Sequence, residues 1–248
     1  MKELTRQIDT HLKELSLRAM TDSYKDLAIK ASKSKLTYEE YLALLLEMEI
    51  NRKKESTINS KLIKSKFSYL KTIEEFDFSF QPNIKETELI NLCSMDFIEQ
   101  KSNVIFLGPP GVGKTHLSIA LGVKACTNRY RVLFITVQKL LEDLMLSQHD
   151  GSLIERLMFY SRLHLLIIDE LGYMPIPREQ ANLLFQLVSS RYEKGSIILT
   201  SNYNFDEWGK VFEDSVVATA IIDRMIHHAK IFYINGSSYR LKDKIKKS

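Results

Sequence analysis

The sequence has 248 residues, of which 44% are hydrophobic and 27% are charged. This length and composition suffice for one ample core, or for one core with a smaller appended module, and they argue against a disordered chain. The two cysteines, Cys93 and Cys126, lack the paired spacing of a disulfide framework or a thiolate zinc site. We therefore expect both thiols to be buried and reduced.

The positive charge is concentrated in the first 72 residues. They contain 15 Lys and Arg against 10 Asp and Glu, whereas the rest of the chain contains 20 against 21. Within the basic cluster Arg52–Lys71, the lysines alternate with Ile63, Phe67 and Tyr69. This mixture suits contact with a nucleic-acid backbone, with apolar or stacking support. The solvated face of an ordinary helix has a similar composition, so this alternative stays open.

Two helices are predicted in the same region. The apolar residues of Leu4–Leu27 recur at near-helical spacing and predict one amphipathic helix. A second helix is predicted from Thr37, which forms a potential capping box with Glu40 before the run YLALLLEMEI. The charges scattered through the first 17 residues predict neither a secretory signal nor a membrane span. We therefore expect a cytoplasmic protein without a membrane partner.

A change of pattern suggests two domains. Phe76–Pro82 interrupts the helical spacing with aromatic residues and a proline. We therefore predict a helical module of residues 1–72 and a second domain of residues 73–248.

The second domain has the alternation of an α/β fold with a parallel sheet. The predicted strands are 103–108, 131–137, 164–169, 195–202 and 230–234, and the predicted helices begin near Lys114, Gln138, Ser152, Arg178 and Val216. After the last strand, Asn235-Gly236 predicts a hairpin turn that leads into a returning strand.

The segment Gly108–Thr115 (GPPGVGKT) matches the phosphate-loop pattern G-x-x-x-x-G-K-[ST] between a predicted strand and a predicted helix. Its glycines let the backbone approach the phosphates of ATP, and its N–H groups point toward them. Lys114 is expected to reach the β- and γ-phosphates, and the Thr115 hydroxyl to coordinate Mg²⁺. The expected nucleotide-binding residues are Gly108, Pro109, Pro110, Gly111, Val112, Gly113, Lys114, Thr115 and His116.

Two acids follow the buried run HLLIID and supply the expected chemistry. Asp169 would hold the metal, and Glu170 would orient or deprotonate the attacking water. A surface turn is the alternative for such a pair. The next strand ends in Thr200-Ser201-Asn202, beside the γ-phosphate if this strand neighbours the one that carries Asp169. Asn202 would then sense the γ-phosphate and its water, unless it serves only to turn the chain.

An arginine in AIIDRMIHH, Arg224, is expected to complete the site of a neighbouring subunit. An exposed salt bridge is the alternative, and Arg191 is a rival for the same role. His227 and His228 lack the spacing and the acidic partners of a metal site and are interpreted as ordinary helix residues. Arg240, on the predicted returning strand, is expected to face the nucleotide.

Several of these segments together resemble the IstB family, the ATP-binding helpers of insertion-sequence transposition. They are YLALLLEMEINRKK, GPPGVGKTHLSIALG, LLIIDELGYMP, RYEKGSIILTSN, FDEWGKVF, AIIDRMIHH and SYRLK. The resemblance implies a three-layer AAA+ P-loop NTPase core with a parallel sheet, preceded by a small all-helical domain. It also implies a Walker A loop at Gly108–Thr115, a Walker B pair at Asp169 and Glu170, a first sensor at Asn202, an arginine finger at Arg224 and a second-sensor-like Arg240.

The resemblance further implies a Mg²⁺-dependent, DNA-stimulated ATPase. Such a protein assembles on duplex DNA as a homo-oligomer with active sites between subunits, and it regulates a cognate transposase. Residues 1–72 would contribute to DNA contact and assembly. A DnaC-like replicative helicase loader shares every ATP-site residue and is the alternative. A small-molecule kinase fits the Asp169-Glu170 pair and Asn202 less well, and a purely structural DNA-binding module has no need of Lys114 or Glu170.

Overall fold

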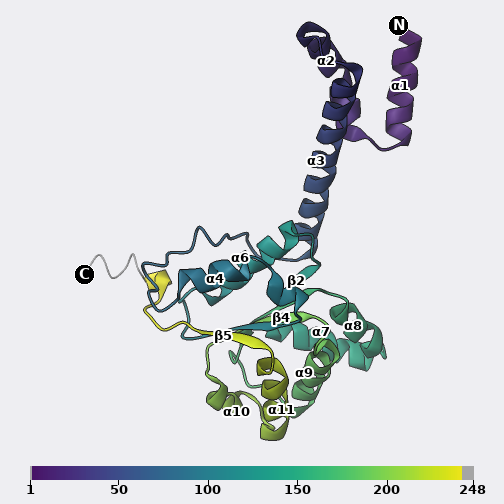
Figure 1. The fold of residues 1–248 in the computed structure, drawn as a ribbon. Coiled ribbons are helices and arrows are strands. Elements are labelled where there is room, and N and C mark those ends of the chain that lie inside the picture. The colour runs from purple at the N-terminus through teal and green to yellow at the C-terminus, as the bar shows by residue number, and fades with distance from the viewer. Residues whose placement is uncertain (1, 242–248) are drawn as a thin grey trace. The chain divides into compact units, whose positions relative to one another are not determined.

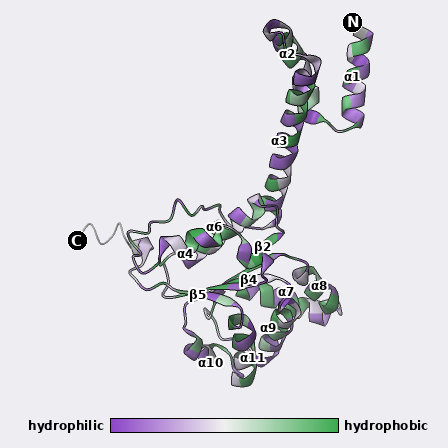
Figure 2. Ribbon diagram, in the orientation of Figure 1, coloured by the Kyte–Doolittle hydropathy of each residue, from purple (hydrophilic) through white to green (hydrophobic). Residues whose placement is uncertain are grey.

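The computed structural model describes residues 2–241, which form two compact units that divide between Ser60 and Lys61. The first unit consists of α1 (Lys2–Glu14), α2 (Arg18–Ser34) and most of α3 (Tyr38–Lys64). Hydrophilic and hydrophobic residues alternate along α3 (Figure 2). Within the described part of the chain, we find no helix with the length and hydrophobicity that a membrane span requires.

The first helical segment is broken, so the prediction of one helix over Leu4–Leu27 is wrong. Helix α1 ends at Glu14, and Ser16 has a left-handed φ of 54°. The N–H of Leu17 donates to the carbonyl of Leu12 at 2.8 Å, as expected where a left-handed residue terminates a helix. The break lets α2 pack against α1, which apolar spacing alone does not reveal.

The predicted capping box at the start of α3 is confirmed. The Thr37 N–H donates to Oε2 of Glu40 at 2.7 Å, and the Glu40 N–H donates to Oγ1 of Thr37 at 3.2 Å. Further along α3, the buried Glu49 carboxylate accepts hydrogen bonds from the N–H groups of Ala19 and Met20, at 2.7 and 3.1 Å. Because these groups open α2, Glu49 satisfies free donors and balances the positive end of the helix dipole.

The second unit begins twelve residues before the predicted boundary at 72/73. The Ser65 hydroxyl lies 3.1 Å from Sγ of Cys126, and the backbone carbonyl of Ser65 accepts a hydrogen bond from the Phe134 N–H at 2.8 Å. The Phe67 ring packs against Phe134, with ring centres 6.2 Å apart. The end of the basic cluster is therefore part of the α/β unit, and Phe67 is held by packing rather than presented for base stacking.

The second unit is built on a five-stranded parallel sheet of order β2-β3-β4-β1-β5. The strands are β1 (Asn103–Leu107), β2 (Val132–Thr136), β3 (Leu165–Leu171), β4 (Ser196–Ser201) and β5 (Ala229–Tyr233). All five predicted strands are confirmed, and β4 lies beside β3, as the proposed position of Asn202 requires.

Helices cover both faces of this sheet (Figure 1). One face carries α4 (Glu86–Leu92), α5 (Asp96–Glu99) and α6 (Lys114–Thr127); the other carries α7 (Val137–His149), α8 (Leu153–Ser161), α9 (Arg178–Arg191), α10 (Trp208–Val211) and α11 (Ser215–Ile226). Successive strand residues enter opposite layers: Ile105 joins one core and Phe106 the other. The result is a three-layer α/β arrangement.

The predicted hairpin after β5 is wrong. The chain instead forms a short 3₁₀ helix, η2 (Tyr239–Leu241), and a second such turn, η1 (Phe205–Glu207), precedes α10. The Ile234 N–H donates to the Leu107 carbonyl at 2.7 Å, and the Tyr239 N–H donates to the Gly111 carbonyl at 2.9 Å. These bonds hold residues 234–239 against the end of β1 and the phosphate loop instead of along β5.

Candidate nucleotide-binding site

The phosphate loop connects the end of β1 to the start of α6. All three of its glycines have positive φ angles, 146° at Gly108, 84° at Gly111 and 103° at Gly113. A Cβ atom at Gly108 would lie 2.1 Å from the Ile234 carbonyl oxygen, and one at Gly113 would lie 2.5 Å from the Phe76 ring. The loop therefore needs glycine at these positions both for its backbone conformation and for close packing.

The Lys114 ammonium lies between the loop and the end of β4. It donates to the carbonyls of Gly108 and Pro109 at 2.6 and 2.8 Å, and to Oδ1 of Asn202 at 2.8 Å. Burial lowers the pKa of Lys114 to about 8, with the Asp169 carboxylate opposing the change and Arg240 adding to it. Phosphate oxygens would offset the loss of hydration, so this cation is suited to bind an anion.

Thr115 and Asp169 form a compact oxygen cluster. The Thr115 hydroxyl lies 3.0 Å from each Asp169 carboxylate oxygen, and the Thr200 hydroxyl donates to Asp169 Oδ1 at 2.6 Å. Burial raises the pKa of Asp169, while the hydrogen bonds from Thr200 and Thr115 oppose that shift. A hydroxyl and a carboxylate are the hard oxygen ligands that Mg²⁺ prefers, so these residues fit the predicted metal.

Glu170 differs from its neighbour in exposure and conformation. Its side chain is exposed, whereas Asp169 is buried. Its φ angle is 68°, and the pairing of β3 with β4 shifts register between Ile168 and Leu171. A left-handed φ is strained in a residue other than glycine, and such backbone strain is common at functional sites. The shift turns the second carboxylate away from the buried cluster toward solvent, where an attacking water would be available.

A cavity of about 180 Å³ lies beside Glu170. Its lining includes Thr136, Gln138, Glu142 and Tyr173. Thr136 ends β2 directly opposite Asp169 in the sheet register. Thr136 is not among the site residues predicted from the sequence. Its position as a polar residue at the end of the strand next to β3 could have indicated it.

Two predicted nucleotide contacts have different surroundings. The His116 ring faces the segment before the loop: Nε2 lies 2.9 Å from the Thr72 carbonyl oxygen, and the ring packs edge-on against Phe76. His116 can therefore contribute to the phosphate site through its backbone at the first turn of α6 rather than through this ring. Arg240 interacts electrostatically with Lys114 and follows Tyr239, whose N–H bonds to the loop.

The two candidate arginine fingers differ in burial. Arg191 is 1% exposed and donates to the carbonyls of Tyr160, Leu163 and Ser196. Burial lowers the pKa of Arg191 to about 10. This side chain binds the protein interior and has no surface to offer a neighbouring subunit.

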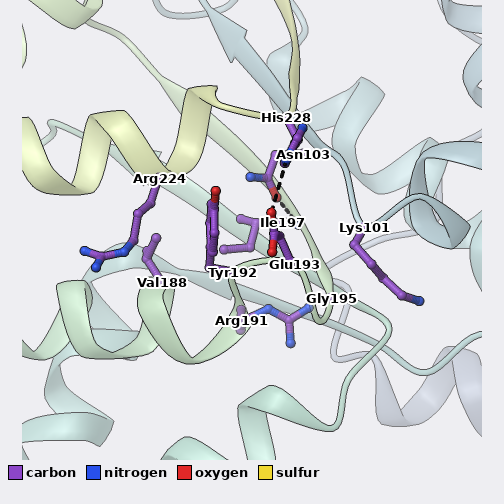
Figure 3. A pocket seen from close by; sticks show the side chains of 10 residues that line it. All are labelled: Lys101, Asn103, Val188, Arg191, Tyr192, Glu193, Gly195, Ile197, Arg224 and His228. Atoms are coloured by element: carbon purple, nitrogen blue, oxygen red, sulfur yellow. Dashed lines mark hydrogen bonds and ion pairs between the residues drawn. The ribbon is translucent and has the colours of Figure 1, made fainter.

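Arg224 lies away from the phosphate loop of its own chain. Its guanidinium carbon is 4.3 Å from the centre of the Phe185 ring. The Arg224 side chain and Asn103 are among the residues that line a small pocket (Figure 3). Asn103 begins β1, whereas the phosphate loop follows the last residue of that strand. Arg224 and the loop therefore lie at opposite ends of β1. Arg224 accordingly does not complete the site of its own subunit.

The family model of the IstB-like ATP binding protein matches residues 10–247. The "Insertion sequence IS21 putative ATP-binding protein" of Pseudomonas aeruginosa is 44% identical over 240 residues, which cover 97% of this chain and 91% of that protein. The "Insertion sequence IS5376 putative ATP-binding protein" of Geobacillus stearothermophilus is 42% identical over 244 residues, covering 98% and 96%.

Solved structures show the same fold at lower identity. A crystal structure of DnaI has a TM-score of 0.56 at 20% identity and covers 66% of this chain and 90% of that one. AMPPCP-bound DnaA from Aquifex aeolicus has a TM-score of 0.56 at 21% identity and covers 71% and 55%, so this chain spans about half of it. These likenesses support the AAA+ P-loop fold. The match of the family model over residues 10–247, with relatives 42–44% identical over nearly the whole chain, shows that the chain belongs to the IstB-like ATP binding protein family.

Proposed function

We propose that this protein is a Mg²⁺-dependent ATPase that assembles on duplex DNA and regulates the transposase of its insertion sequence. The observation that carries the proposal is the separation of Arg224 from the cluster of Lys114, Thr115, Asp169 and Glu170. One subunit holds the groups for binding a triphosphate, its metal and its water. Arg240 is the arginine beside this cluster, whereas Arg224, the arginine expected to neutralise transition-state charge as a finger, lies away from it.

Each residue of the cluster has a distinct role in this proposal. Lys114 contacts the β- and γ-phosphates, and Thr115 and Asp169 hold Mg²⁺, which neutralises phosphate charge when bound. Glu170 orients the attacking water and accepts its proton, while Asn202 positions the γ-phosphate and that water. Arg240 reaches the phosphates from the segment that covers the loop.

Assembly on DNA makes turnover conditional. If Arg224 acts on the nucleotide of an adjacent subunit, hydrolysis requires two subunits in register. Exposed basic residues such as Arg52, Lys53 and Lys54 supply the charge for contact with DNA phosphates. ATP then favours the assembled state, and hydrolysis releases it, which gives the transposase a timed signal.

The relatives favour a role in transposition over helicase loading. The relatives at 42–44% identity, over nearly the whole chain, are named for insertion sequences. Likeness to the DnaC helicase loader, with a TM-score of 0.50 at 20% identity, extends to the fold alone. A transposase reading frame beside the gene would support the first role, and a replication locus would support the second.

The deciding experiment measures ATP hydrolysis and particle size with and without duplex DNA, at two salt concentrations. We expect DNA to stimulate turnover and to form a larger particle, and both effects to weaken as salt rises. Hydrolysis without any added acceptor would exclude a small-molecule kinase. Turnover that is unaffected by DNA and proceeds in monomers would contradict the proposal.

A further inference from the structure

Three side chains with metal-binding groups meet where α9 and α11 end. Glu193 follows α9, and His227 and His228 follow α11. One ligand atom of each residue lies within 4.8 Å of the other two. The interpretation of the histidines as helix residues without an acidic partner is therefore wrong: α11 ends at Ile226, and the fold brings Glu193 to them.

Neighbouring contacts already orient these groups. The Tyr192 ring stacks on both imidazoles at an interplanar angle of 27° in each case, and its hydroxyl lies 2.6 Å from Nδ1 of His227. A hydrogen bond to one ring nitrogen is the usual means of orienting a metal-binding histidine. The His228 carbonyl accepts from the Asn103 N–H at 2.7 Å, which fixes the backbone between α11 and β5.

Glu193 is held toward the histidines. Its Oε1 atom lies 3.4 Å from Nε2 of His228. Its φ angle of 57° is unusual for a residue with a side chain. All three side chains are exposed, so small rotamer changes can shorten the distances between their ligand atoms without disturbing the core.

We propose that Glu193, His227 and His228 bind one divalent transition-metal cation of the zinc class. Two imidazoles and one carboxylate form a three-ligand set that leaves a coordination position open for water or another ligand. Imidazole nitrogen favours Zn²⁺, Ni²⁺ and Co²⁺ over Mg²⁺, which prefers oxygen. The site is therefore chemically distinct from the oxygen cluster at Thr115 and Asp169.

The site has a position from which it can influence Arg224. Arg224 precedes His228 by about one turn, and both line the pocket that contains Tyr192, on either side of that ring (Figure 3). A bound cation would link the ends of α9 and α11 and add positive charge at the end of the helix that carries Arg224. This consequence rests on the proposed function, and we expect the cation to lower turnover by the assembled protein.

Binding is tested on full-length protein without a histidine tag, stripped with a chelator and titrated with Co²⁺ in the absence of nucleotide. We expect about one Co²⁺ per chain with the visible absorption of a tetrahedral nitrogen and oxygen site. Affinity should fall about 10-fold or more in Glu193→Gln and in His228→Ala. The matched control, His149→Ala, removes another exposed histidine and should bind as the original protein does. Equal binding by all four proteins, or none by the original, overturns the site.

The effect on turnover is tested separately, with Zn²⁺ added at constant excess Mg²⁺. Turnover by the original protein should fall, while His228→Ala should be insensitive. Equal inhibition of both overturns the link to Arg224. Absence of turnover in every protein would count against the proposed ATPase, whereas the Co²⁺ titration would still decide whether the cation site exists.

Discussion

The ammonium of Lys114 lies 2.8 Å from Oδ1 of Asn202, which joins the first turn of α6 to the end of β4. These residues are 88 positions apart and meet because β4 lies beside β1 in the sheet. The same arrangement brings Thr200 to Asp169. Strand order therefore assembles the site, and each of its side chains can be tested on its own.

Replacing Asn202 with Ala should slow turnover more than it weakens ATP binding. The amide positions a charged group whose other acceptors, the carbonyls of Gly108 and Pro109, stay in place. A hydrogen bond to a charged group contributes about 1.5–3 kcal/mol, so turnover should fall on the order of 10- to 100-fold. Steady-state hydrolysis and equilibrium nucleotide binding check this, and a loss confined to binding would contradict the sensor role.

Replacing Glu170 with Gln should preserve ATP binding and lower turnover about 10²-fold or more, because the amide cannot accept the proton of the attacking water. The DNA-bound oligomer should persist longer, since hydrolysis no longer ends it. Sizing after excess competitor DNA measures that lifetime. Glu142→Gln, which alters another acid that lines the same cavity, is the matched control and should turn over nearly normally.

Arg224→Ala and Lys114→Ala should each be inactive alone but regain partial turnover when mixed. In a mixed assembly, some sites receive an intact phosphate loop from one subunit and an intact arginine from its neighbour. Hydrolysis measured across mixing ratios checks this, with the exposed Lys230→Ala replacing Arg224→Ala as a control. A mixture with no more turnover than its components would rule out action between subunits.

Much of this site was accessible from the sequence because its motifs are local. The phosphate loop, Asp169 and Glu170 each follow a predicted strand, and the carboxyl ends of parallel strands share one edge. The contacts of Phe76 with Gly113 and of residues 234–239 with the loop depend on tertiary packing. No spacing rule relates such distant segments.

The elements that the sequence predicted incorrectly also depend on tertiary packing. The apolar spacing of Leu4–Leu27 continues through Ser16, although the chain reverses there so that α2 can pack on α1. Asn235-Gly236 has the composition of a hairpin turn, but Tyr239 bonds to Gly111 instead of a neighbouring strand. The burial of Arg191, which sets it apart from Arg224, is not revealed by the composition of their helices.

ATP affinity should weaken as pH rises above about 8, since burial lowers the pKa of Lys114 to about 8 and the neutral amine attracts phosphate less. Bound phosphates favour the charged form, so binding near pH 8 should take up a proton. The same pKa shift affects the stability of the fold. Between about pH 8 and pH 10.5 the unfolded lysine binds more protons than the folded one, so the contribution of Lys114 to the free energy of unfolding rises with pH in this range. Calorimetry in buffers of different ionisation enthalpy measures the uptake, and its absence in the presence of ATP would contradict the shift.

Arg191→Ala should reduce stability rather than remove a contact between subunits. The change removes the buried hydrogen bonds from the Arg191 guanidinium to the carbonyls of Tyr160, Leu163 and Ser196, and a hydrogen bond from a charged group contributes about 1.5–3 kcal/mol. We expect the free energy of unfolding to fall by about 3 kcal/mol or more, with a lower urea midpoint. Arg178→Ala, which loses only an exposed ion pair with Asp214, should change it by less than about 1 kcal/mol. If Arg191→Ala instead unfolded normally but lost turnover that Lys114→Ala restored on mixing, Arg191 rather than Arg224 would be the finger.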